Sequence, residues 1–256
     1  MSVSRGEFLK SLGKSLPGMI LPGGIATAAQ RVLGKMAAAS GPSETAAVPT
    51  SPQAKSAMAP KLEFINNGPS AGNRVAFTFD DGPIPGKTTR ILDAFKERKL
   101  HATFFMIGRN IAADPELAQR VLAEGHDVGN HTYTHPKLPS LNDEQACAEI
   151  QKTDDIMLET MNYRPIWFRP PYGELRPDQF GLVARHGMRP VLGNASTRDW
   201  SEPGEDKILS TILTAPAGSI IICHDFAEQT ANCLGRALDS LLERGIVPVT
   251  LTTLLS

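Results

Sequence analysis

The sequence is poor in cysteine, in aromatic residues and in net charge, and these shortages exclude several classes of protein. Its three cysteines are too few for a small fold stapled by disulfides. Lysine and arginine total 26 against 27 aspartates and glutamates, so the net charge of −1 gives no electrostatic reason to bind nucleic acid or an anionic membrane. What is present is an ordinary globular composition, 41% hydrophobic over 256 residues, which is enough for one sizeable core.

The cysteines lie in patterns typical of buried positions. Cys147 and Cys233 fall in helical patterns and Cys223 in an apolar strand, so we expect three small buried side chains. A Cys223–Cys233 bridge stays open if the protein is exported, because sequence cannot establish a disulfide.

The first sixty residues differ from the rest. Residues 1–36 begin with basic side chains and continue in an uncharged stretch, residues 15–30, whose end is rich in small residues such as Ala26-Thr27-Ala28. This pattern is typical of an export signal; a disordered tail is the alternative. The segment Ser4–Lys10 is similar to a twin-arginine motif, with Gly6 where the second arginine belongs. The uncharged stretch, residues 15–30, is too short and too rich in proline and glycine to span a membrane. We therefore expect an exported protein, periplasmic or in the cell envelope, and otherwise a cytoplasmic one.

Residues 37–60 are rich in alanine, serine and proline and predict a linker. Residues 61–256 predict a single domain, which we expect to be a monomer. Seven short apolar runs predict strands: 75–79, 102–107, 126–129, 166–168, 191–192, 220–223 and 247–249. Helical spacing lies between them at 87–99, 115–124, 142–161, 177–186, 205–213 and 230–244, the third with Asn142 and Gln145 placed for a capping box. This alternation predicts a mostly parallel sheet, and seven strands favour an incomplete barrel.

Reactive side chains follow five of these apolar runs, and the carboxyl ends of parallel strands are where α/β folds build their sites. Asp80 and Asp81 follow the first run, and one can ligate a metal while the other acts as a base; an ordinary polar turn is the alternative. His131 and His135 are four residues apart, so on one helical turn both imidazoles would reach one ion. Together these residues favour a metal-dependent hydrolytic site.

The later runs carry the remaining chemistry. Arg169 can hold a carboxylate in a two-pronged grip, and Tyr172 offers the first backbone N–H after two prolines, which suits an oxyanion; a stiff turn with a surface arginine is the alternative. Asp199 can orient His224 as a general acid. Trp200 suits a sugar ring or a core position equally. Asp225 has no assigned role beyond a helix N-cap or a turn.

The motifs resemble, in order, those of NodB-type polysaccharide deacetylases, a family that includes peptidoglycan N-acetylglucosamine deacetylases and chitin deacetylases. The stretches that carry the resemblance are Thr78-Phe79-Asp80-Asp81-Gly82-Pro83, His131-Thr132-Tyr133-Thr134-His135, Arg169-Pro170-Pro171-Tyr172-Gly173, Asp199-Trp200 and Cys223-His224-Asp225. The resemblance runs from about Arg74 to the C-terminus. It implies a distorted (β/α)7 barrel as a single catalytic domain.

The resemblance also implies roles for individual residues. It implies three metal ligands, Asp81, His131 and His135, and a divalent metal, usually zinc, with Co²⁺, Ni²⁺ or Mn²⁺ as alternatives. It implies five catalytic residues: Asp80 as base, Arg169 to position Asp80, Tyr172 for its backbone N–H, Asp199 to tune His224, and His224 as acid. Tyr172 and Trp200 are also expected to contact substrate. Two positions depart from the family pattern, Ser196 where an aspartate is frequent and Gly193 where an aromatic residue is expected.

The expected activity is removal of N-acetyl groups from N-acetylglucosamine units of a polysaccharide. Peptidoglycan, chitin oligomers and an exopolysaccharide all remain open as the substrate. Two alternatives also remain. The same site suits an O-acetyl ester or a non-sugar amide, and the fold suits a carbohydrate-binding pseudoenzyme, because a fold does not fix a function.

Overall fold

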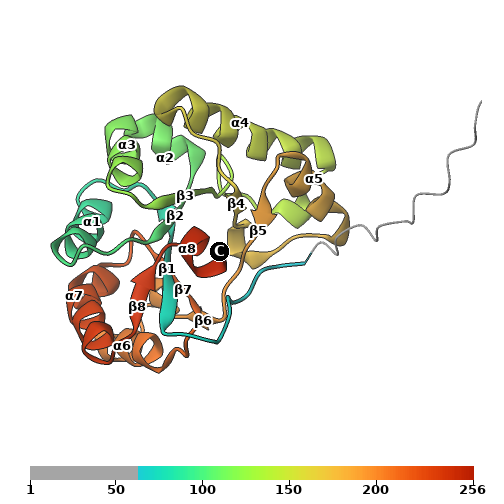
Figure 1. Cartoon of the computed structure of the whole chain (residues 1–256). Coiled ribbons are helices and arrows are strands. Elements are labelled where there is room, and N and C mark those ends of the chain that lie inside the picture. Colours follow the sequence, from blue (N-terminus) through green and yellow to red (C-terminus); the bar gives the residue numbers. More distant parts are fainter. Residues whose placement is uncertain (1–62) are drawn as a thin grey trace, which may run out of the picture. The chain divides into compact units, whose positions relative to one another are not determined.

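Strand β1 (Arg74–Gly82) lies at the centre of a curled parallel sheet in the computed structural model, which describes residues 63–256 (Figure 1). The sheet runs in the order β5-β4-β3-β2-β1-β7-β6, and β8 also pairs with β1. The other strands are β2 (Thr103–Met106), β3 (Asp127–Asn130), β4 (Trp167–Phe168), β5 (Arg189–Pro190), β6 (Ala195–Ser196), β7 (Ile220–His224) and β8 (Val247–Val249). All of their pairings are parallel.

The sheet is a half-barrel, because β5 and β6 do not pair with each other. Two isolated bridges lie beside this opening, a parallel one between Ile65 and Val191 and an antiparallel one between Asn67 and Ser219. The distorted barrel that the motifs implied is confirmed in this open form.

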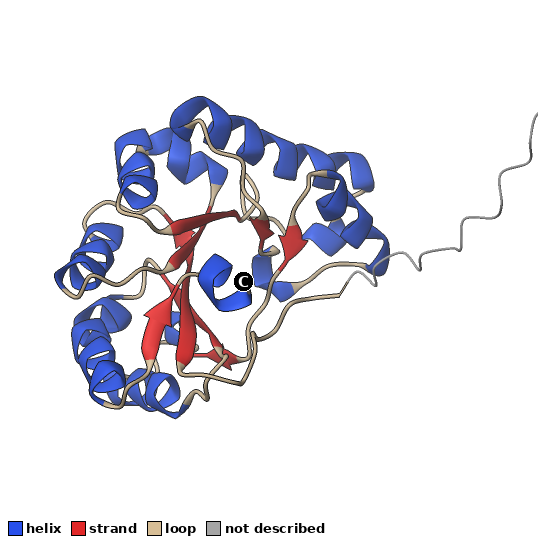
Figure 2. Cartoon of the chain, viewed as in Figure 1, coloured by secondary structure: helices blue, strands red, loops and turns tan. Residues whose placement is uncertain are grey.

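Helices cover the outside of the sheet (Figures 1 and 2). These outer helices are α1 (Lys87–Glu97), α2 (Gly108–Ala113), α3 (Pro115–Ala123), α4 (Asp143–Met161), α5 (Phe180–Arg185), α6 (Glu205–Thr214) and α7 (Glu228–Glu243), whereas α8 (Leu251–Leu255) lies inside the ring of strands. The predicted capping box is present at the start of α4, where Asn142 accepts from the Gln145 amide at 2.8 Å. No helix between residues 63 and 256 is long and apolar enough to cross a membrane.

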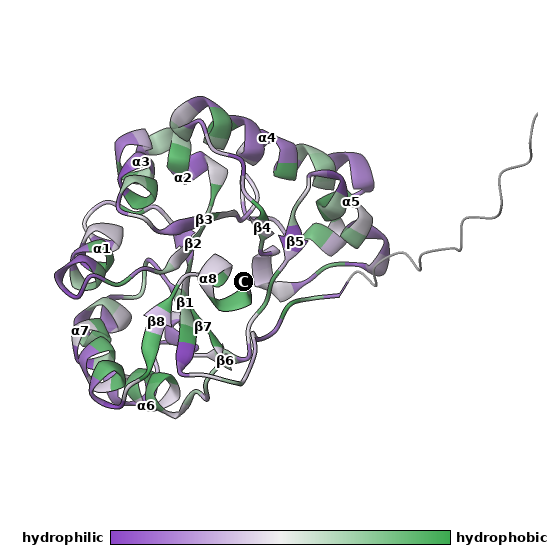
Figure 3. Cartoon of the chain, in the orientation of Figure 1, coloured by the Kyte–Doolittle hydropathy of each residue, from purple (hydrophilic) through white to green (hydrophobic). Residues whose placement is uncertain are grey.

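The alternation of β1 divides the hydrophobic core in two. Val75, Phe77 and Phe79 face the helices and are fully buried there, where each phenyl ring contributes about 1.5–3 kcal/mol. The intervening residues face the barrel interior, where a second cluster contains Ala76, Phe105, Trp167, Val191, Ile220, Leu251 and Leu254. Short α8 supplies the two leucines of this cluster and lies in the middle of the ring in Figures 1 and 3.

Several sequence predictions were wrong in detail. Residues 191–192 are not a strand; they follow β5, and Val191 pairs only in an isolated bridge. Strand β6 and the short helices α2 and α8 were missed, because elements of two to six residues are too short to display a period.

The cysteines are all free in the structure, so the Cys223–Cys233 bridge is not formed. Cys223 and Cys233 are buried as expected, whereas Cys147 is only half-buried and lies 3.6 Å from His186 Nε2. The predicted export segment and the whole of the predicted linker lie outside the described residues, so they remain predictions, as does the monomeric state.

Candidate active site

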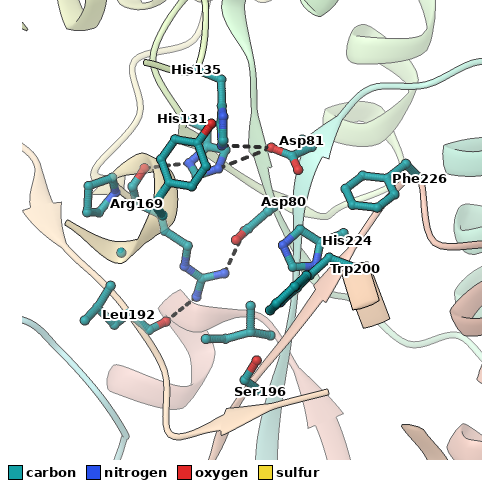
Figure 4. Close-up of a pocket in the computed structure, with 14 residues that line it drawn as sticks. Asp80, Asp81, His131, His135, Arg169, Leu192, Ser196, Trp200, His224 and Phe226 are labelled. Atoms are coloured by element: carbon teal, nitrogen blue, oxygen red, sulfur yellow. Dashed lines mark hydrogen bonds and ion pairs between the residues drawn. The ribbon is translucent and has the colours of Figure 1, made fainter. Parts of the chain in front are cut away.

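A pocket of about 530 Å³ opens at the carboxyl ends of the strands. It brings together side chains that are up to 146 residues apart in the sequence, from Asp80 to Phe226 (Figure 4). All eight predicted catalytic and metal-binding residues are in or beside it. The lining consists of Asp80, Asp81, His131, His135, Arg169, Pro170, Tyr172, Gly173, Leu192, Ser196, Trp200, Ile222, His224 and Phe226, and Asp199 contacts His224 from behind.

Asp81, His131 and His135 form a cluster with metal-ligand geometry. One ligand atom from each lies within 4.8 Å of the others. Asp81 Oδ1 lies 3.5 Å from His131 Nε2 and 3.2 Å from His135 Nε2, and it is buried without a hydrogen-bond partner among the described residues. A carboxylate oxygen buried in this way is costly unless a cation or donor meets it. The two-nitrogen, one-oxygen donor set therefore fits a divalent ion and leaves positions open for water and substrate.

The ionisation of the cluster also suits metal binding. Burial by itself would raise the pKa of Asp81, but the neighbouring imidazoles of His131 and His135 lower it overall. Burial, and then the charge of His131, lowers the pKa of His135. An ionised carboxylate beside a neutral imidazole is the state in which these groups ligate a metal.

The two histidines do not lie on a helical turn, which corrects the sequence prediction. Residues 131–135 form a loop in which Thr132 and His135 both have φ of 64°, in the left-handed region. Asp81 also has a left-handed φ, of 75°, and it lies where the register between β1 and β2 shifts between Asp80 and Gly82, as at a β-bulge. Such conformations cost about 1–3 kcal/mol for residues other than glycine, so the surroundings must hold them in place.

Two residues that the sequence analysis missed hold this loop. Asn130 Oδ1 accepts a hydrogen bond from the Thr132 amide at 2.8 Å. Glu149 on α4 accepts from the amides of Tyr133 and Thr134, at 3.0 and 2.7 Å, and from the Thr134 hydroxyl at 2.8 Å. The sequence around Glu149 gives no local indication that it holds the loop, because its hydrogen-bond partners lie outside its own helix.

Asn130 is itself fixed by a buried network. Its amide nitrogen donates to Asp154 Oδ1 at 2.8 Å, and Asp154 Oδ2 lies 2.8 Å from His186 Nδ1. Burial is the main reason that the pKa of Asp154 is raised, while its hydrogen bonds to Asn130 and His186 oppose the rise. The network connects α4 and the end of α5 to the histidine loop.

Asp80 is buried beside Arg169, and neither residue is more than 5% exposed. Arg169 Nη1 donates to Asp80 Oδ1 and to Thr78 Oγ1, each at 2.7 Å. Nη2 donates to the Leu192 carbonyl, and the guanidinium lies 4.2 Å from the centre of the Phe105 ring. Arg169 is thus not a surface arginine, and its grip on Asp80 is single rather than two-pronged, because its other donors serve backbone carbonyls.

His224 lies across the pocket from Arg169 (Figure 4), and it forms a second pair with Asp199. His224 Nδ1 lies 2.7 Å from Asp199 Oδ1, while Asp199 Oδ2 accepts from the His224 amide and from the Thr230 hydroxyl. Burial by itself would lower the pKa of the His224 imidazole, but the hydrogen bond to Asp199 and the nearby charge of Asp80 raise it. His224 Nε2 remains for a substrate.

Three aromatic side chains surround the pocket and are exposed. Tyr172 is 59% exposed, Trp200 56% and Phe226 36%. The alternative of a core position for Trp200 is therefore wrong. Tyr172 has φ of 60°, and its backbone N–H donates to no other described residue, so this amide has no protein partner among them.

Asp225 lies behind the pocket and is fully buried. Its amide donates to the Asp80 carbonyl at 2.9 Å, and its carboxyl accepts from the Thr88 hydroxyl. Burial is the main cause that raises the pKa of Asp225 to about 7, and the carboxylates of Asp81 and Asp80 add to it. It is not a helix N-cap, because Ala227 holds that position at α7. At Gly82 a Cβ would lie 2.0 Å from Asp225 Oδ2, so this contact requires glycine.

Comparison with known proteins now places the chain. Residues 67–191 match the polysaccharide deacetylase family. The chain is 33% identical to a peptidoglycan-N-acetylglucosamine deacetylase of Bacillus cereus, across 76% of this chain and 72% of that protein. The chain belongs to the polysaccharide deacetylase family. The resemblance carried by the sequence motifs is thereby confirmed, and the protein is a hydrolase of that family by descent.

Other members of the polysaccharide deacetylase family are similar to nearly the same extent. A chitooligosaccharide deacetylase of Bradyrhizobium is 38% identical across 70% of this chain and 90% of that protein. Among solved structures, a CE4 family pseudoenzyme from Bacillus anthracis superposes with a TM-score of 0.73 at 26% identity, covering 76% of this chain and 69% of that one. The fold is shared between enzymes and a pseudoenzyme, so the activity of this chain must be argued from its site.

Proposed function

We propose that this protein is a metal-dependent N-deacetylase that hydrolyses the acetamide of N-acetylglucosamine units in a polysaccharide. One observation supports the proposal most directly: the same pocket contains a three-residue ligand cluster, the Asp80 carboxylate held by Arg169, and the His224 imidazole held by Asp199. Amide hydrolysis needs an activated water, a stabilised oxyanion and a protonated leaving amine, and the pocket offers a group for each.

Asp81, His131 and His135 would hold the metal, and their donor set favours zinc. Such an ion supplies Lewis acidity, which lowers the pKa of water and polarises a carbonyl. His131 is oriented for this role from its far side, since its Nδ1 lies 2.6 Å from the Arg169 carbonyl oxygen. If Nδ1 carries the proton it donates to that carbonyl and leaves Nε2 unprotonated toward Asp81.

Asp80 acts as the general base in this proposal. It takes a proton from the attacking water as the new C–O bond forms at the acetamide carbon. The hydrogen bond from Arg169 fixes its orientation and keeps one oxygen occupied, so that the other faces the pocket. The free N–H of Tyr172 donates to the negative charge that develops on the carbonyl oxygen.

His224 acts as the general acid. Its imidazolium donates a proton to the nitrogen as the C–N bond breaks, and the products are acetate and a glucosamine unit. Burial opposes the protonated imidazole, but the hydrogen bond to Asp199 outweighs it and raises the pKa, which favours the acid form of His224. This feature favours an amide over an O-acetyl ester, because an amine leaves only after protonation whereas an alkoxide depends on the proton less.

The sugar is expected to rest against the exposed rings of Tyr172 and Trp200 at the mouth of the pocket. A binding module has no need of a poised acid and base, which argues against a pseudoenzyme. The matched relatives act on peptidoglycan and on chitooligosaccharides, so both polymers belong in the test.

The test is acetate release from N-acetylglucosamine oligomers and from peptidoglycan by the purified full chain. Release that a chelator stops and zinc restores would support the proposal, and the ratio of the two rates would rank the polymers. An O-acetylated sugar serves as the comparison substrate. Release from the ester alone would overturn N-deacetylation, and no release from any substrate with metal bound would leave the pseudoenzyme as the better account.

A further inference from the structure

The floor of the pocket lies deeper than an acetyl group requires. We propose that the pocket continues beneath the reacting groups to Ser196, and that this floor admits short N-acyl groups longer than acetyl, such as N-propionyl and N-glycolyl. Ser196 is then a specificity-determining residue. The inference rests on the proposed function, since it concerns the acyl group of the same substrate.

The register of the sheet sets the depth of the floor. Asp80 on β1 is level with His224 on β7, and Thr78 is level with Ile222, which in turn is level with Ser196 on β6. The level of Thr78 and Ile222 is two residues earlier along β1 and β7 than the level of Asp80 and His224. At about 3.3 Å per residue, it lies roughly 6–7 Å deeper in the barrel.

Ser196 faces this interior rather than the helices. Its neighbours Ala195 and Thr197 are buried on the other side of β6, Ala195 within the outer core and Thr197 in a hydrogen bond to the Ile222 carbonyl. Ser196 lines the pocket and is nevertheless exposed, so the crevice reaches it (Figure 4). The level below is closed by large side chains that include Ile220 and Val191. On the level of Thr78 itself, the side chain of Ile222 and the guanidinium of Arg169, which donates to Thr78, occupy part of the interior.

Gly193 lies beside the floor of the pocket and has no side chain to occupy it. A Cβ at this position would lie 2.8 Å from both the Ile220 carbonyl oxygen and Ile222 Cγ1, and φ is 155°. A side chain here would have to displace Ile222 or occupy the crevice itself. The glycine and the small serine therefore leave space between Leu192 and Ile222.

The acyl group is the part of the substrate that points toward this space. The carbonyl carbon must lie near Asp80, the amine near His224, and the sugar toward the exposed mouth, so the remaining substituent points inward. An acetyl methyl lies about 1.5 Å beyond the carbonyl carbon and reaches contact about 3.5–4 Å further. That sum of roughly 5–5.5 Å falls short of the floor, which leaves room for at least one more heavy atom.

The chemistry of the floor selects the kind of group. Leu192 and Ile222 give apolar walls that suit a methylene. The Ser196 hydroxyl makes no hydrogen bond to another described residue, whereas the hydroxyl of Thr78 already donates to the Ile221 carbonyl and accepts from Arg169. Ser196 is thus the group at this depth that is free to pair with the hydroxyl of a glycolyl chain.

The experiment compares chitotriose carrying N-acetyl, N-propionyl or N-glycolyl groups as substrates for the metal-loaded full chain. We expect kcat/KM for the longer groups to stay within about tenfold of the acetyl value. Ser196→Leu should lower the propionyl-to-acetyl ratio by roughly 10-fold or more, the effect of one methylene in a filled pocket. Ser196→Ala should lower the glycolyl-to-propionyl ratio. Ser210→Leu, an exposed serine on α6, is the matched control and should change neither ratio.

Acetyl turnover with a more than hundredfold loss for both longer groups would overturn this inference and leave the proposed function intact. The same holds if Ser196→Leu leaves the propionyl-to-acetyl ratio unchanged. If no amide is hydrolysed, the proposed function fails, and binding of the free acids still tests the floor. Propionate and glycolate should bind at least as tightly as acetate by calorimetry, and Ser196→Leu should weaken propionate selectively; equal weakening of all three would overturn the inference.

Discussion

The imidazole of His131 contacts the backbone of Arg169, with His131 Nδ1 2.6 Å from the Arg169 carbonyl oxygen. The side chain of the same arginine donates to Asp80 at 2.7 Å. One residue at the end of β4 therefore orients a metal ligand through its main chain and the proposed base through its side chain. This coupling fixes the distance between the two halves of the site, so a change at Arg169 is expected to disturb both.

The first prediction concerns Asp80. Asp80→Asn should lower kcat by 10²- to 10⁴-fold, the usual contribution of a general base, while the bound metal is retained. Elemental analysis measures whether the metal is retained, and turnover on N-acetylglucosamine oligomers measures the loss of kcat. Wild-type turnover in the variant would remove Asp80 from the mechanism.

Changes at the proposed metal ligands should instead lower the metal content first, and turnover as a consequence. Asp81→Asn or His131→Ala removes one of three donors, so metal content after dialysis should fall and turnover should fall with it. Excess zinc should restore part of the activity of Asp81→Asn, because a neutral amide oxygen is a weaker ligand. Unchanged metal content in both variants would place the ion elsewhere.

The third prediction tests the support of the histidine loop. Glu149→Gln replaces an acceptor of three hydrogen bonds and should weaken metal affinity by roughly 10–100-fold, the usual effect of residues that orient ligands. Competition with a chromophoric chelator gives the Kd. Glu144→Gln, an exposed change in the first turn of the same helix, is the control. Equal Kd values for the two variants would show that Glu149 does not hold the loop for metal binding.

The fourth prediction concerns the acid. Burial opposes protonation of His224, but the hydrogen bond to Asp199 outweighs it and raises the pKa above that of an ordinary histidine. As pH rises through this pKa, turnover should fall. Asp199→Asn should move that alkaline limb of the kcat/KM profile to lower pH, because the stabilising charge is lost. An alkaline limb that does not move would separate His224 from the acid step.

The last prediction concerns Asp225 and the stability of the metal-free protein. Its folded pKa of about 7 lies above the ordinary aspartate value of 3.8, so between these pH values the folded state holds a proton that the unfolded chain releases. The stability from this group is present below about pH 4 and is lost as pH rises through 7. Asp225→Asn cannot ionise, so its free energy of unfolding relative to wild type should improve by roughly 2–4 kcal/mol between pH 4 and 8. Urea denaturation across pH measures this, and a flat difference would contradict the buried protonated carboxyl.

The sequence by itself determined the order of the main elements and the identity of the reactive side chains. Runs such as Val75–Phe79 and Ile220–Cys223 display their burial directly, because apolar residues at strand length have few other uses. The capping residues of α4 were equally visible, since Asn142 and Gln145 are three positions apart in one local motif. Asp80, Asp81, His131 and His135 stood out because two carboxylates and two closely spaced imidazoles follow apolar runs, and these residue types are metal ligands.

Only the tertiary structure decided how these residues meet. The left-handed conformation of Asp81 is accompanied by a hydrogen bond from Asn110 on α2 to its carbonyl, which no local pattern encodes. Glu149 and Asp225 likewise have partners that lie 15 and 137 residues away. Ser196 became a pocket residue only when β6 was placed level with Ile222. Local sequence determines which side chains are available, whereas register and loop geometry set the distances between them, and hydrogen bonds and catalysis depend on those distances.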